Sequence, residues 1–191
     1  MKPIQLTQEE KRAAAQWAAD ESWVKQKRYQ DDKDYMECVA DIMADPIFQS
    51  MDRFIQHGST TCKSHCIQVS YMSYALCRKF GWSYREAARA GLLHDLFLYD
   101  WHTHARETGN HFHGYTHPRV AMNNASRYFK LTDTEKDMIL RHMWPLTPVP
   151  PKTKEAFSII YSDKFCGLVE VGANMKGWVM SWKIVQNYIH N

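Results

Sequence analysis

Apolar residues recur along most of the chain at intervals of three and four, which is the period of an amphipathic or buried α-helix. The segment from Thr61 to Phe80 shows this spacing most clearly, with apolar residues at Ile67, Val69, Met72, Tyr74, Ala75, Leu76 and Phe80. Gly81 follows it and suits the left-handed C-cap of a helix. No period-two alternation is long enough to predict a sheet. The pattern therefore predicts an all-α fold.

Helix starts are marked by three capping boxes, in which Thr or Ser is followed three residues later by Glu. The boxes are Thr7–Glu10, Ser83–Glu86 and Thr132–Glu135, and they predict helices that end near Arg28, Leu96 and Met143. Proline at a first helical position predicts a short helix from Pro46 to about His57 and another from Pro118 to Phe129. Further helices are expected over 35–44, 153–171 and 176–189.

Two segments are predicted to be loops. Residues 100–116 are rich in His and Gly, and residues 144–151 contain four prolines. The second segment should be stiff and extended, since proline cannot continue a helix. It is either a rigid connector or a wall of an active site, because it follows directly on His142.

The composition fits one folded domain with helical extensions. The chain has 191 residues, 45% of them apolar, and a net charge of 24 − 21 = +3 without a Lys/Arg block, which argues against nucleic-acid binding. No apolar run approaches the roughly 20 residues of a membrane span, and the N-terminus is polar. Five cysteines, an odd number, predict reduced and mostly buried thiols. A cytoplasmic location is therefore expected, and the Cys62/Cys66 pair alone is a weak zinc signal.

Histidine is the unusual residue: seven of ten lie between His94 and His142. On the predicted helices, potential metal ligands fall on one element after another, at His65, His94-Asp95, His117, His142 and Asp163. A carboxylate among apolar neighbours is costly unless it is paired or bound to a cation. A buried Asp–His or Asp–Arg pair would explain any one of these residues. Their recurrence on successive helices favours a metal site in the core of a bundle.

This ordered set resembles the HD-domain superfamily of metal-dependent hydrolases, over about residues 58–171. The resemblance implies an HD-domain helical bundle at 58–172, with an N-terminal helical extension (1–57) and a C-terminal helix (173–191). It is similar to the six-ligand, two-metal branch, and it implies that one metal is bound by His65, His94 and Asp163, the second by His117 and His142, and both by Asp95. A Gly-Tyr-Pro signature is missing after His142, so cyclic-di-GMP is not the expected substrate.

Imidazole and carboxylate ligands together suit divalent Fe, Mn, Co, Ni or Zn. Two such ions would hold a hydroxide for in-line attack on phosphorus. The expected function is hydrolysis of a phosphate ester or anhydride of a nucleotide or another small molecule. The alternative is an HD-fold di-iron oxygenase acting on a small polar substrate, because the same six ligands serve both classes. A nucleotide-sensing module is a third hypothesis, which the retention of all six ligands weakens.

Candidate catalytic residues beside the ligands are Asp95 itself, His113, Arg119 and Lys164. His113 and His111 could act as general acids, substrate contacts or partners of the ligands. Arg119 could reach a phosphate, and Lys164 faces either the site or solvent, since it points about 100° away from Asp163. The aromatic residues near the predicted site either stack on a nucleotide base or take part in ordinary packing.

The 176–189 helix has an apolar stripe that fits either the core or an interface. The sequence therefore leaves open whether the chain forms a homodimer.

Overall fold

The computed structural model describes residues 28–57 and 60–171, and the helices predicted from Thr7 and over 176–189 lie outside that range. Within it the fold is all-α, as predicted. The α-helices are α3 (Lys33–Met43), α4 (Pro46–Ser50), α5 (Cys62–Phe80), α6 (Tyr84–Leu93), α7 (Trp101–Thr108), α8 (His113–Tyr128), α9 (Asp133–Arg141) and a last helix over 155–171. Two 3₁₀ helices are η1 (Arg28–Gln30) and η2 (Met51–Arg53).

The helix ends follow the sequence signals at most positions. The Thr61 side chain accepts from the Ser64 N–H and caps α5, and Gly81, at φ 65°, ends it in the left-handed conformation. The capping box at Thr132 and Glu135 is present in full at the start of α9. The box expected at Ser83 does not form. Instead, Glu86 accepts from the Thr132 hydroxyl at 2.7 Å, and the Ser83 N–H donates to the Glu155 carboxylate at 3.2 Å, so a tertiary contact replaces the local one.

Four predictions at the level of elements are wrong. Strands β1 (Ile55–His57) and β2 (Thr60–Thr61) form a small antiparallel sheet where a helix end was expected. Residues 101–108, predicted as loop, form α7, because the Asp100 carboxylate accepts from the His102 N–H and supplies a cap. Helix α8 begins at His113 and contains Pro118 in its interior. The proline-rich segment 144–151 is a non-helical loop, as predicted, but it forms turns and bends over 144–149 where an extended conformation was expected.

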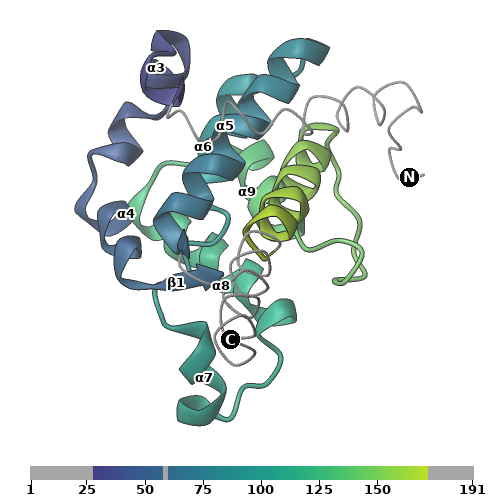
Figure 1. Cartoon of the computed structure of the whole chain (residues 1–191). Helices are drawn as coiled ribbons and strands as arrows, with labels where there is room; N and C mark the ends of the chain where they lie inside the picture. The colour runs from purple at the N-terminus through teal and green to yellow at the C-terminus, as the bar shows by residue number, and fades with distance from the viewer. Residues whose placement is uncertain (1–27, 58–59, 172–191) are drawn as a thin grey trace, which may run out of the picture.

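The core is built around α5 and α6. In Figure 1 they lie in the middle of the molecule, with α3 and α4 on one side and the 155–171 helix on the other. The Tyr35 hydroxyl of α3 lies 2.8 Å from the Ser70 hydroxyl, and Ser70 donates to the Ala88 carbonyl. Arg89 of α6 pairs with Glu135 at 3.0 Å and with Asp41 at 2.6 Å. Residues 33–57 therefore pack on the bundle, while the domain boundary at 57/58 stays a prediction.

Gly91 sets the distance between the two central helices. A Cβ built on Gly91 would lie 2.5 Å from Ser70 Cα, which is backbone and cannot move aside alone. We expect Gly91→Ala to lower the free energy of unfolding by about 1–3 kcal/mol, measured by urea denaturation. Gly167→Ala is the matched control, since its Cβ would make an ordinary 3.5 Å contact with His57 and alanine favours a helix. Equal stability of the two variants would contradict this account of the packing.

The five cysteines are buried, as predicted, and all five are free. Cys62 donates to the Asp95 carbonyl at 3.6 Å, and the Cys66 sulfur lies 3.8 Å from His94 Nδ1, so both support the loop that carries the His-Asp pair. In the described part of the chain, no helix combines the length and the apolar character needed to cross a membrane.

Candidate metal centre

All six predicted ligands converge on one buried centre, although they come from five helical segments. His65 lies in the first turn of α5, His94 and Asp95 directly follow α6, and His117 lies in α8. His142 directly follows α9, and Asp163 lies in the 155–171 helix. The four histidines and Asp95 are each at most 5% exposed. The bundle thus gathers residues that are up to 98 positions apart.

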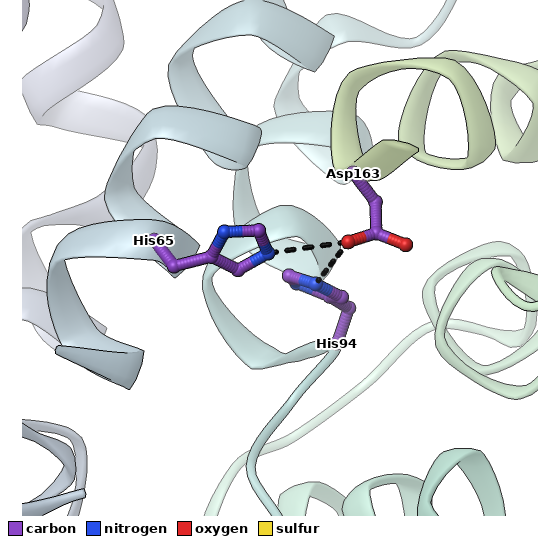
Figure 2. Close-up of side chains that lie close together, drawn as sticks. All are labelled: His65, His94 and Asp163. Atoms are coloured by element: carbon purple, nitrogen blue, oxygen red, sulfur yellow. Dashed lines mark hydrogen bonds and ion pairs between the residues drawn. The ribbon is translucent and has the colours of Figure 1, made fainter. Parts of the chain in front are cut away.

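Asp163 holds one half of the centre together. Its Oδ1 atom lies 3.2 Å from His65 Nε2 and 3.7 Å from His94 Nε2 (Figure 2). Although burial raises the pKa of Asp163, the neighbouring imidazoles of His65 and His94 outweigh it and hold the pKa well below its usual range. The three side chains each offer one ligand atom, and these atoms all lie within 4.8 Å of one another, so the group could hold a metal ion.

Asp95 lies between the half formed by His65, His94 and Asp163 and the two remaining histidines, His117 and His142. Its Oδ2 lies 3.5 Å from His94 Nε2, and its Oδ1 lies 3.2 Å from His117 Nε2 and 3.5 Å from His142 Nε2. The Nε2 atoms of His117 and His142 are themselves only 2.8 Å apart. His94, Asp95 and His142 form a second group whose ligand atoms lie within 4.8 Å of one another. One carboxylate therefore faces imidazoles from both halves of the centre.

The imidazoles are oriented by contacts of their outer nitrogens, the Nδ1 atoms that face away from the centre. The Nδ1 atoms of three histidines contact backbone carbonyls at 2.8–2.9 Å: His94 with Gly91, His117 with His113 and His142 with Ile139. Because a carbonyl only accepts, each Nδ1 carries the proton, and a neutral ring then directs its Nε2 lone pair into the centre. A metal-binding histidine typically has this arrangement.

The electrostatics of the centre fit a cation. Burial, and then the neighbouring His117 and His94, lower the pKa of His142 to about 3, so its ring is neutral at neutral pH. Among the described residues, His94 Nε2 and Asp95 Oδ1 are buried without a hydrogen-bond partner. Such orphaned atoms are costly in a folded protein unless something binds them. A metal ion would satisfy both, and the nitrogen and oxygen donors present are those that divalent transition metals accept.

A pocket of about 230 Å³ opens onto the centre. The metal-centre residues Asp95, His117, His142 and Asp163 line its floor. Its walls come from several elements and comprise Gln56, His57, Trp101, His113, Gly114, Met143, Lys164 and Gly167. A ligand in this pocket would therefore touch the centre directly.

The predicted catalytic residues divide into two kinds. His113 and Lys164 line the pocket. His113 stacks on His117 with ring centroids 4.6 Å apart, and burial, then His117, lower its pKa to about 4. It is therefore neutral at neutral pH, which favours hydrogen bonding over the role of general acid. Lys164 donates to the Trp144 carbonyl at 3.1 Å. Arg119 is exposed and does not line the pocket, because two residues along a helix turn its side chain away from His117.

Three pocket or support residues were not singled out from the sequence as part of the site. Gln56 donates to Asp95 Oδ2 at 2.6 Å, and His57 lines the pocket beside it. Both lie on β1, which the helical pattern did not predict. Glu170 contacts His65 Nδ1 with both carboxylate oxygens at 3.1 Å. Its spacing of seven residues from Asp163, which is two helical turns, was a signal that could have revealed it.

Comparisons with protein families, with curated proteins and with solved structures found no match for this chain.

Proposed function

We propose that this chain is a metal-dependent phosphohydrolase of the HD type, with two divalent transition-metal ions in the centre. The observation that carries the proposal is the position of Asp95, whose two oxygens face different imidazoles: Oδ2 faces His94, and Oδ1 faces His117 and His142. His65, His94 and Asp163 would hold one ion, and His117 and His142 the other. A carboxylate shared by both ions would hold them close together, which suits two-metal hydrolysis, where two nearby ions stabilise the attacking and leaving oxygens.

Bound metal would supply a water of lowered pKa and positive charge for the phosphate oxygens. The chain's own residues contribute orientation. The Gln56 amide holds Asp95 Oδ2 at 2.6 Å, and the backbone carbonyls hold three imidazoles. Lys164 stands at the pocket with its ammonium fixed by the His142 and Trp144 carbonyls, at 3.5 and 3.1 Å. An ammonium at this position would pair with the negative charge of a phosphoryl group in the pocket.

The size of the pocket favours a small substrate. Its volume of about 230 Å³ is below the roughly 300–1,000 Å³ of sites for drug-sized ligands. Trp101 and His113 stack with ring centroids 5.4 Å apart and form an aromatic wall beside the metal centre. A phosphomonoester carrying a flat or compact group fits these features better than a dinucleotide.

The test is phosphate release from a panel of phosphomonoesters, including nucleoside 5′-monophosphates, by protein loaded with Mn²⁺, Co²⁺, Zn²⁺ or Fe²⁺. We expect turnover with at least one metal, and we expect Lys164→Met to lower kcat/KM by about 10–100-fold, since a charge-assisted hydrogen bond is lost. Lys79→Met, at an exposed position on α5, is the matched control and should leave turnover unchanged.

Two results would overturn the proposal. One is the absence of phosphate release from every ester with every metal. The other is oxygen consumption by the iron-loaded protein with a small polar substrate, which would favour the oxygenase function for the same ligands.

A further inference from the structure

The four imidazoles of the centre differ in what holds their outer nitrogens. Three contact backbone carbonyls through Nδ1. His65 is the exception, because its Nδ1 lies 3.1 Å from both carboxylate oxygens of Glu170. Glu170 is 6% exposed, on the same helix as Asp163 and two turns beyond it. A carboxylate is seldom buried this deeply without a specific role.

A carboxylate and a carbonyl act differently on the imidazole that they hold. A carboxylate carries a full charge, so it makes the imidazole a more basic ligand and adds negative potential at the metal. The ring of His65 lies between two carboxylates, one on each nitrogen.

The two halves of the centre consequently differ in charge. Asp95 is shared between them. The half around His65 and His94 also has Asp163 as a direct ligand candidate and Glu170 behind His65. In the half around His117 and His142, the imidazole nitrogens contact Asp95, each other and backbone carbonyls within the described residues. A divalent cation should therefore be bound more tightly in the first half.

We propose that Glu170 is a positioning residue that makes the His65–His94–Asp163 half the tighter metal site, so that the two ions bind in sequence. The inference rests on the metal centre of the proposed function and is independent of the reaction that the centre catalyses. Glu170 itself does not ligate the metal; it acts through His65.

The experiment is a titration of metal-free protein with Co²⁺, followed by visible absorption in competition with a chelator. Wild type should bind Co²⁺ in two steps, the first at least about 10-fold tighter than the second. Glu170→Gln keeps a hydrogen-bond acceptor for His65 but removes the charge. We expect it to weaken the first step by about 10–100-fold and to leave the second unchanged.

Two further variants make the test specific. Glu155→Gln removes another buried carboxylate from the same helix, one that accepts from the Ser83 N–H at 3.2 Å, and should titrate like wild type. His117→Ala should lose the weak step and keep the tight one, which identifies the tight half even if Glu170→Gln does not fold.

The inference is overturned if Glu170→Gln titrates like wild type, if both steps weaken equally, or if His117→Ala loses the tight step. These results would leave the metal centre and the proposed function standing. Wild-type protein that binds no Co²⁺ would remove the metal centre, and the proposed function and the role of Glu170 would fall together.

Discussion

Asp95→Asn is expected to abolish phosphate release, with a loss of at least about 1,000-fold, and to reduce metal content to less than one ion per chain. The carboxylate is 3% exposed and lies at ion-pair distance from His94, His117 and His142. Asparagine keeps its shape but removes the charge that both ions would share. The loss of several kcal/mol of metal-derived stabilisation of the transition state corresponds to a factor of this size.

The measurement for Asp95→Asn is elemental analysis beside a phosphate-release assay, with circular dichroism to verify the fold. His117→Ala is the comparison variant, because its Nε2 faces only the second half of the centre and it should keep one ion. Turnover of Asp95→Asn close to wild type would show that Asp95 does not bridge two metals and would remove the mechanism.

Metal removal is expected to have the largest effect on stability. Each ion that binds only the folded chain adds about 2.7 kcal/mol when its free concentration is 100 times its Kd. Two ions would therefore add roughly 5 kcal/mol, which corresponds to a rise in Tm of about 10–20 °C for a chain of this size. Differential scanning calorimetry with and without a chelator measures the shift directly.

Asp95→Asn again supplies the control for this measurement. A chelator should leave its Tm unchanged if the metals account for the shift in wild type. The same Tm for wild-type protein with and without the chelator would mean that the buried histidines and aspartates are stabilised by one another rather than by metal.

The long helices were predictable because their signals are local. Apolar spacing and Gly81 defined α5, and the capping box at Thr132 and Glu135 defined the start of α9. The convergence of the six His and Asp residues followed from their order on successive helices, and the structure brings all six together. Their role as metal ligands, and the membership of the HD superfamily, remain predictions.

The sequence was less informative where tertiary contacts decide the structure. Helix α7 depends on a single carboxylate cap at Asp100, inside a segment whose His and Gly content suggested a loop. Gln56 reaches Asp95 only because β1 pairs with β2, and a three-residue strand leaves no periodic signal. Arg119 was expected near the phosphate from its closeness to His117 in sequence, but helical geometry turns it outward.

Metal content per chain is the decisive measurement for a two-metal centre. It should be measured by elemental analysis on protein purified without a metal-binding tag. We expect two equivalents of Fe, Mn, Co, Ni or Zn, in the as-purified protein or after reconstitution. One equivalent would reduce His117 and His142 to substrate contacts, and no bound metal even after reconstitution would contradict the account as a whole.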